Sequence, residues 1–400
     1  RVDISILFFE LGLTLLKTNG RISYISSNQF LIGEYGRLMR KYLLTKCKIE
    51  KIIDFADLPV FQDALTYVSI FVFSNNLPSD FHYKEVKDLD EAISGNYKDE
   101  ILINLSSLSD DSWTLTSTER QRILEKIQKF PSLDSIGCKC WYGIVSGSDD
   151  VFILSKAKAN ELQLEEKLLL PLTRAQNCCR YTYSDYDLFV LYPYRNLNGK
   201  TEIIALDEIK NNFPNVYSYL LRNKSILTKR KDSRKTFEDK NNWYGLTRFG
   251  QFEVFNQQKI VFPGECQKNK FGIDILKTGY SGARVFSITV NEKITLELLT
   301  AILNSSVVEF YLHSVAALKQ GGYYSYSSTV IDRIPILNNI NVSDVKIISE
   351  NVQILFSLNE ILRKTINTFL SRIQSNFTTE KPSNKLKEFY NYDFKTFVTE

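Results

Sequence analysis

The sequence predicts an α/β fold followed by an α+β fold: the C-terminal part of a doubly wound sheet, then a mixed α+β domain, then a helical tail. Three observations predict it. Residues 1–75 have the order helix, strand, helix, strand, strand. Between residue 137 and about residue 335, short apolar strands alternate with glycine turns and a few helices. Residues 342–377 repeat apolar side chains at helical spacing.

In the first block, apolar residues at helical spacing predict a helix that stops at Asn19-Gly20; they are Ile4, Leu7, Phe8, Leu11 and Leu15. A second helix is expected from Ser27 or Asn28 to about Leu44. Strands are expected at 21–25, 48–55 and 66–73, the last two apolar and β-branched enough to be interior. No glycine-rich strand-to-helix turn occurs in this block, although a nucleotide or cofactor would normally bind at one. We therefore expect the start of the sheet to precede Arg1.

The rest of the chain divides by composition into three parts. Residues 77–130 are polar and weakly patterned, which predicts a linker or peripheral segment with a short helix at 117–130. Residues 131–338 form the predicted mixed domain, with helices near 206–223 and 295–314. Residues 339–400 form the helical tail, and residues 1–76 are the back half of the α/β domain.

Composition excludes several classes of protein. A chain of 400 residues with 44% hydrophobic and 24% charged residues is a globular protein of two or three domains, not a disordered one. No apolar run is long enough to cross a bilayer, so we expect a cytoplasmic protein without a membrane partner. Six cysteines and two histidines show no paired short spacing, so we expect reduced thiols and no metal site. The start at Arg1 and the single methionine, Met39, suggest a piece of a longer protein.

The positive charge is local. The net charge is +4, and the window 224–240 holds seven basic and three acidic residues, so its excess of four equals that of the whole chain. The cations then run into Trp243, Tyr244 and Arg248. Charged and planar groups together are what a groove against phosphates and bases requires. The alternative is a solvated helix end, which is what charge runs usually are.

Several stretches, in chain order, resemble one enzyme family. They are LLKTNGRISYISSNQFL at 15–31, IDFADLPVFQDA at 53–64, YGIVSGSDDVF at 142–152, LPLTR at 170–174, WYGLTR at 243–248, KIVFP at 259–263, LNS at 303–305 and IP at 334–335. Together they are similar to the TaqI-type adenine-N6 DNA methyltransferases and the type II restriction-modification enzymes that contain them. The resemblance spans most of the chain.

The resemblance implies a Rossmann-like methyltransferase sheet followed by a domain that recognises double-stranded DNA. Such enzymes transfer a methyl group from S-adenosylmethionine to an adenine flipped out of the duplex. They use a glycine-bearing motif and an Asn-Pro-Pro-Tyr motif, and none of the nine prolines here is adjacent to another. Both motifs are expected upstream of Arg1, in the same polypeptide or a separate subunit. We therefore expect no catalytic residue in this chain, no S-adenosylmethionine bound by it alone, and no activity from it alone.

The resemblance and the charge pattern together nominate site residues. Phe61 is the candidate for stacking on the flipped base, the alternative being a core aromatic. The candidate DNA contacts are Lys229, Arg230, Lys231, Arg234, Lys235, Trp243, Tyr244, Arg248, Gly147, Ser148, Tyr323 and Tyr324. The adjacent cations are expected on phosphates, because flexible charges position rather than specify.

Two of these assignments and the function itself keep alternatives. The turn at 143–150 brings backbone close to DNA or is an ordinary hairpin, and the loop at 321–326 enters a groove or is a tyrosine-rich turn. The chain could also be a stand-alone specificity subunit that binds DNA without catalysis. A third interpretation is an interaction protein that pairs through its tail helices.

Overall fold

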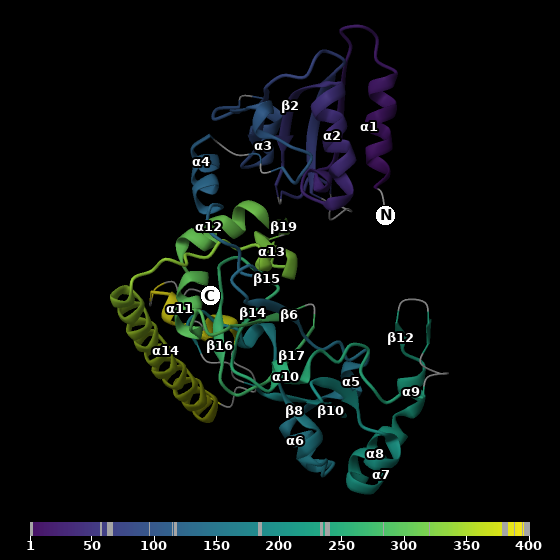
Figure 1. Cartoon of the computed structure of the whole chain (residues 1–400), viewed down its shortest axis with the longest axis vertical. Coiled ribbons are helices and arrows are strands. Elements are labelled where there is room, and N and C mark those ends of the chain that lie inside the picture. Colours follow the sequence, from purple (N-terminus) through teal and green to yellow (C-terminus); the bar gives the residue numbers. More distant parts are fainter. Residues whose placement is uncertain are drawn as a thin grey trace. The chain divides into compact units, whose positions relative to one another are not determined.

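The computed structural model describes most of the chain: residues 3–56, 58–61, 67–95, 97–113, 115, 118–182, 186–232, 235–236, 241–282, 284–319, 321–377, 383–387, 389–393 and 395. It contains two compact units (Figure 1). Unit 1 comprises residues 1–136, 264–268 and 305–338, and unit 2 comprises residues 137–263, 269–304 and 339–400. The four-part division made from the sequence stays a prediction.

Unit 1 is built on a five-stranded sheet of order β1-β3-β2-β4-β5. Its strands are β1 (Arg21–Ser27), β2 (Lys48–Asp54), β3 (Val68–Ser74), β4 (Phe81–Glu85) and β5 (Ile101–Ile103). β3 is antiparallel to both β1 and β2, whereas β4 is parallel to β2. The first three strands confirm the predicted ones. β4 and β5 fall within residues 77–130, the predicted linker or peripheral segment, and the structure adds them to one side of the same sheet.

Helices cover both faces of this sheet. On one face, α1 (Ile4–Thr14) and α2 (Arg37–Lys46) pack over Ile52, Phe71 and Phe73. On the other, α3 (Leu89–Ser94) packs near Ile53 and Val68. Because successive strand residues point to opposite faces, both faces are apolar.

Helix α1 buries a different face from the one its spacing suggested. Phe9 and Leu13 are buried, and the Phe9 ring lies 5.4 Å from the Phe71 ring, centroid to centroid. The predicted apolar stripe is instead exposed; its members are Ile4, Leu7, Phe8, Leu11 and Leu15. A helix that is apolar all round is normally buried all round. The exposed stripe of α1 is therefore an uncovered apolar face.

The remainder of unit 1 comes from distant parts of the chain. It contains α4 (Thr118–Ile127), α12 (Ser306–Val315), α13 (Ser328–Asp332) and a small sheet of β15 (Glu265–Cys266), β20 (Tyr323–Ser325) and β19 (Ala317–Lys319). A hydrogen bond of 2.9 Å from the Leu133 amide to the Ile334 carbonyl ties the two chain segments together.

Unit 2 is built on two four-stranded sheets. One has the order β16-β14-β18-β6, from β16 (Gly272–Asp274), β14 (Lys259–Pro263), β18 (Val285–Thr289) and β6 (Lys139–Tyr142). The other has the order β17-β8-β9-β7, from β17 (Gly279–Tyr280), β8 (Leu169–Thr173), β9 (Leu188–Leu191) and β7 (Ile153–Ser155). All five residues of β14 are buried, which places the core of the unit between its sheets and helices.

Short helices and two hairpins surround these sheets. The helices are α5 (Asp149–Phe152), α6 (Lys156–Glu161), α7 (Leu206–Asn212), α8 (Pro214–Arg222), α9 (Lys224–Thr228), α10 (Phe252–Phe255) and α11 (Leu296–Leu303). The hairpins pair β10 (Tyr194–Leu197) with β11 (Lys200–Ile203), and β12 (Lys231–Asp232) with β13 (Lys235–Thr236). Proline at the first turn of α8 separates it from α7, so the predicted helix at 206–223 is two helices.

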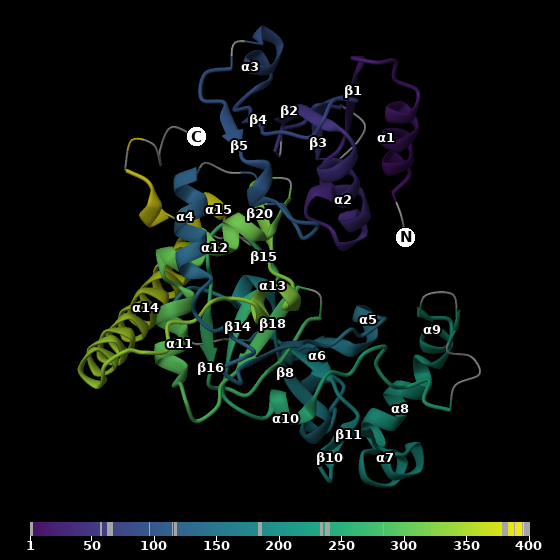
Figure 2. The same ribbon diagram turned by 45° about the horizontal axis from the view of Figure 1, so that its top comes forward.

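The predicted helical tail is confirmed as one helix of 36 residues, α14 (Val342–Phe377), followed by α15 (Asn384–Lys387). α14 lies against α11 (Figure 2), where Val352 and Phe356 pack on Ile273. Among the described residues no single helix is long and apolar enough to span a membrane; α11 and α12 reach that length and composition only together, across a bend.

Candidate nucleic-acid interface

Polar side chains gather at one edge of the sheet in unit 1. β1 and β2 are both antiparallel to β3, and β4 is parallel to β2, so the carboxyl ends of β1, β2 and β4 meet at this edge. In open α/β sheets such an edge is where ligands bind. Asp54, the last residue of β2, is the centre of the group. Its carboxylate accepts hydrogen bonds from Asn28 Nδ2 (2.9 Å), Ser69 Oγ (3.0 Å), Tyr83 Oη (3.1 Å) and the Ala56 amide (3.0 Å).

This network holds the backbone at Ala56, upstream of Phe61. Ala56 has a φ of 47°, a conformation that alanine rarely adopts, and the Asp54 carboxylate holds its amide. The Tyr83 hydroxyl binds the other oxygen of Asp54, and burial, together with that charge, raises the pKa of Tyr83 well above its ordinary value. Phe61 follows with 45% of its side chain exposed, so it is not a core aromatic. Its role in stacking stays a prediction.

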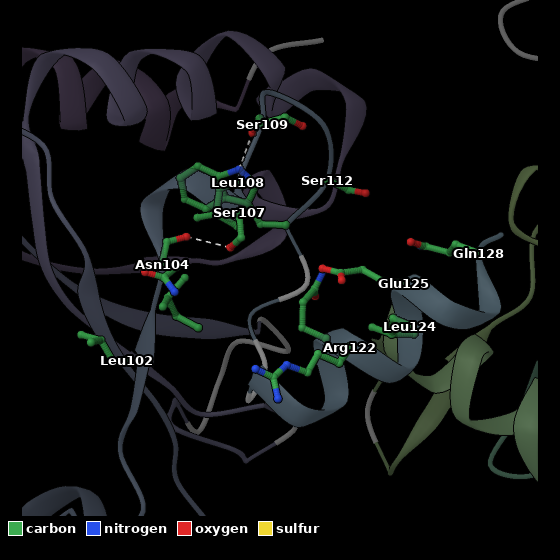
Figure 3. Close-up of a pocket in the computed structure, with 13 residues that line it drawn as sticks. Leu102, Asn104, Ser107, Leu108, Ser109, Ser112, Arg122, Leu124, Glu125 and Gln128 are labelled. Carbon is green, nitrogen blue, oxygen red and sulfur yellow. Dashed lines mark hydrogen bonds between the residues drawn. The ribbon is translucent and has the colours of Figure 1, made fainter.

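Unit 1 contains a cavity of about 660 Å³ beside Leu44, Asp80 and Leu105, and two further cavities. The smaller, of about 200 Å³, borders the Asp54 edge and is lined by Asn28, Asp54, Arg120 and by His313 and Tyr324, whose rings stack at 3.9 Å. The larger, of about 370 Å³, lies between the loop at 102–113 and α4 and is lined by Arg122 and Glu125 of the helix and by serines of the loop (Figure 3). It contains no predicted site residue.

Three chain segments meet in unit 2 at the predicted turn. Ile144 donates its amide to the Tyr280 carbonyl (2.8 Å) and accepts from the Gly282 amide (2.5 Å). Val145 and Arg248 exchange two backbone hydrogen bonds of 2.9 and 3.0 Å. The turn at 143–148 is therefore bound on both sides, by the segment at 280–282 and by the segment containing Arg248.

Two glycines make this close approach feasible. A Cβ on Gly143 would lie 2.6 Å from the Tyr280 ring, and it would also meet the backbone of that residue. Gly147 has a φ of +75°, a left-handed conformation that favours glycine, and a Cβ there would meet the Thr247 hydroxyl. Gly147 itself is exposed and Ser148 is half-buried. The turn is exposed at Gly147, whereas Gly143, Ile144 and Ser146 are buried; the approach of DNA to it stays a prediction.

The basic window divides between surface and interior. Lys229, Lys231 and Arg248 are exposed. Arg230 is only 6% exposed, and Trp243 and Tyr244 are 7% and 4% exposed. Arg234 lies outside the described residues, and for Lys235 only the backbone, in β13, is described.

The burial corrects the direct DNA contact predicted for three residues. The Trp243 ring lies in the core with Lys224 Nζ 5.3 Å from its centroid, and the Tyr244 hydroxyl donates to the Ile204 carbonyl at 2.9 Å. Arg230 donates to four backbone carbonyls, as described below. A DNA-binding groove and a protein core can both contain cationic and aromatic side chains. Composition alone therefore could not show that these three residues are buried.

The two predicted tyrosines lie in unit 1. Tyr323 is 43% exposed at the start of β20, whereas Tyr324 is half-buried and stacks on His313. Tyr323 is therefore accessible for the predicted DNA contact, whereas Tyr324 lines the smaller cavity.

Two residues that the sequence did not single out lie close to these sites along the chain. Asp54 organises the sheet edge; its signals in the sequence were its place at the end of an interior strand and within the stretch at 53–64 that resembles the family. Arg284 is exposed just after the segment at 280–282 that binds the turn. The glycines at 279 and 282 were the available signal for this second close approach.

Among the described residues no group of three or more His, Cys, Asp or Glu side chains gathers to hold a metal ion. Five of the six cysteines are buried, and Cys179 is exposed. Burial raises the pKa of the Cys47 thiol to about 12.

Comparison with known protein families gives three matches. Residues 1–61 match the Eco57I restriction-modification methylase family, and residues 195–336 match the TaqI-like C-terminal specificity domain. Residues 342–400 match a domain of unknown function, DUF8810. The first two matches coincide with the Asp54–Phe61 segment and with most of the basic window and its neighbouring strands.

Curated relatives agree with the family matches. The chain is 25% identical to the type II restriction enzyme and methyltransferase RM.Eco57I of Escherichia coli, over 84% of this chain and 36% of that protein. It is 24% identical to the type II methyltransferase M.BstVI of Geobacillus stearothermophilus, over 84% of this chain and 61% of that protein. This chain therefore spans less than two thirds of the length of either relative.

A solved structure shares the fold. The type IIL restriction-modification enzyme MmeI, determined in complex with DNA, superimposes with a TM-score of 0.59 at 15% identity, over 97% of this chain and 47% of that one. The resemblance expected from the sequence is confirmed: this chain is a relative of the type II restriction-modification methyltransferases, with a methylase segment followed by a TaqI-like specificity domain.

Proposed function

We propose that this chain is the DNA-recognising, C-terminal portion of a site-specific adenine-N6 DNA methyltransferase, and that the parent protein transfers a methyl group from S-adenosylmethionine to a flipped adenine. The observation that carries the proposal is the occurrence, on one chain, of a methylase segment ending at Phe61 and a TaqI-like specificity domain. The exposed cations Lys229, Lys231 and Arg248 support DNA as the partner.

The chemistry explains why an aromatic side chain is needed beside the target. The exocyclic amine of adenine lies inside the duplex, so the base must leave the stack at a cost of a few kcal/mol. Stacking on an aromatic ring offsets part of that cost. Phe61 supports this role because its ring is exposed and because the Asp54 network holds the backbone that precedes it.

The described residues do not fit S-adenosylmethionine by themselves. β1 runs from Ser27 into Asn28 and β2 runs from Asp54 into Phe55, so neither is followed by a glycine-rich turn. The Asp54 carboxylate already accepts four hydrogen bonds from the protein. We therefore assign the cofactor to the parent protein and derive no step through it.

The uncovered apolar face of α1 supports the proposal that the catalytic domain has a further half, outside this chain. Leu7, Phe8 and Leu11 each expose more than half of their surface, and among the described residues β1 pairs only with β3. An exposed apolar stripe beside an open strand edge is a surface made to be covered. We propose that the remainder of the methyltransferase sheet covers it.

The test uses the parent protein with S-adenosylmethionine and unmethylated genomic duplex DNA, followed by mass analysis of the nucleosides. We expect N6-methyladenine from the parent and no methylated nucleoside from this chain alone. Methylcytosine as the product would contradict the adenine assignment, and methylation by this chain alone would contradict the placement of the chemistry in the missing half.

A further inference from the structure

Arg230 lies in the middle of the basic window but does not point to solvent. Its guanidinium donates from Nε to the Leu227 carbonyl (2.9 Å) and from Nη1 to the Ser146 carbonyl (2.8 Å). Nη2 donates to the carbonyls of Trp243 (2.6 Å) and Gly245 (2.8 Å). Four carbonyls from three separate segments therefore converge on one side chain.

The three segments carry or adjoin most of the DNA contacts predicted in unit 2. Leu227 is in α9, which leads directly into Lys229 and Lys231. Ser146 precedes Gly147 in the turn, where a Cβ on Gly147 would lie 3.4 Å from Arg230 Nη1. The segment from Trp243 to Gly245 leads into Arg248. The Arg230 guanidinium thus binds the backbone of every segment that carries one of these exposed groups.

A guanidinium suits this place for a physical reason. It is planar and offers five donors in a fixed fork, whereas an ammonium is a point charge on a flexible stem. The carbon of the guanidinium lies 5.1 Å from the centroid of the buried Phe152 ring. Burial lowers the pKa of Arg230 to about 10, so the side chain remains charged at neutral pH.

We propose that Arg230 is a positioning residue for DNA sequence recognition: its guanidinium sets the positions of the turn at 143–148, the segment at 243–248 and the cations that follow α9, without touching DNA. The proposal rests on the proposed function. A phosphate contact strengthens binding to every DNA sequence alike and adds to the salt dependence of binding. A positioning residue should instead affect the preference for one sequence over another.

The experiment binds the full chain to a pool of duplexes with a random central segment, and sequences the bound fraction. The same chain is titrated with the enriched duplex and with the starting pool at several salt concentrations. Arg230→Lys and Arg230→Met are compared with Lys229→Met, which removes one exposed charge from the neighbouring position. Thermal melting checks that each variant is folded.

For the Arg230 variants we expect the affinity ratio between enriched duplex and pool to fall at least about tenfold, while the salt slope on the pool stays unchanged. Arg230→Lys should lower the ratio almost as much as Arg230→Met, because the three donors of an ammonium sit on one atom and cannot reach the four carbonyls that Nε, Nη1 and Nη2 of the guanidinium bind. For Lys229→Met we expect the slope to fall by about 0.9 with the ratio kept.

A second variant covers the case in which the Arg230 variants do not fold. Gly147→Ala removes no charge and no hydrogen bond, but its methyl group meets Thr247 and its φ of +75° is strained, so it displaces the same turn. It should lower the affinity ratio between enriched duplex and pool and leave the salt slope on the pool unchanged. Retained selection in both Gly147→Ala and Arg230→Lys, or a slope lowered by Arg230→Met as by Lys229→Met, would overturn the inference. Failure of the unaltered chain to bind the pool would instead contradict the proposed function.

Discussion

Replacing Asp274 with asparagine is expected to destabilise unit 2 by about 3–5 kcal/mol, because it leaves a buried ammonium without its counter-charge. Lys259 Nζ lies 2.5 Å from Asp274 Oδ2, and both side chains are fully buried. The same carboxylate oxygen accepts from the Thr278 amide (2.8 Å) and hydroxyl (3.0 Å). Burial lowers the pKa of Lys259, and the attraction of Asp274 opposes that shift.

The measurement is urea unfolding followed by tryptophan fluorescence, since Trp141 and Trp243 both belong to unit 2. The matched control is Glu161→Gln, which removes one partner of the exposed pair Lys158–Glu161 and should change stability by less than about 1 kcal/mol. Replacing Lys259 and Asp274 together by apolar residues should cost less than Asp274→Asn alone. A change below about 1 kcal/mol for Asp274→Asn would contradict this account of the buried pair.

Replacing Phe61 with alanine in the parent protein is expected to slow methylation about 5- to 150-fold, the kinetic equivalent of the 1–3 kcal/mol that one stacked base is worth. Affinity for duplex DNA should change less than about threefold, because stacking acts only after the base has left the helix. The readout is the turnover rate at saturating DNA beside the dissociation constant.

Phe130→Ala is the control for Phe61→Ala, since Phe130 is also in unit 1 and is 41% exposed against 45% for Phe61. It should leave the rate within about twofold. Phe61→Trp should restore most of the rate, because another aromatic face can stack. If the rate of Phe61→Ala equals that of the unaltered protein, Phe61 has no part in holding the base.

The elements that the sequence predicted well are those whose pattern is long and regular. The apolar period of residues 342–377 is unambiguous, and α14 forms over that range. β4 was missed because its exposed positions, such as His82, and its charged Lys84 dilute an apolar pattern of five residues. For α1, apolar residues on every side leave the periodicity unable to decide which face is buried.

The interior position of Arg230 could not be predicted because its partners are distant in sequence. Ser146 is 84 residues away, and the groups that bind the guanidinium are backbone carbonyls, which leave no trace in the residue types. Lys229 and Lys231 face solvent as a charge run normally does. In unit 2 the predicted DNA surface therefore keeps the exposed Lys229, Lys231 and Arg248, whereas Arg230, Trp243 and Tyr244 belong to the core.

The central claim is that the exposed cations beside the turn of unit 2 bind DNA, and its most direct test is the salt dependence of duplex binding by this chain. We predict that the logarithm of affinity falls linearly with the logarithm of salt concentration, and that Lys229→Ala with Lys231→Ala lowers the slope by about 2. Lys346→Ala with Lys364→Ala, which removes two exposed charges from α14, should leave it unchanged. Binding that does not depend on salt, or a slope that the first pair leaves intact, would contradict the claim.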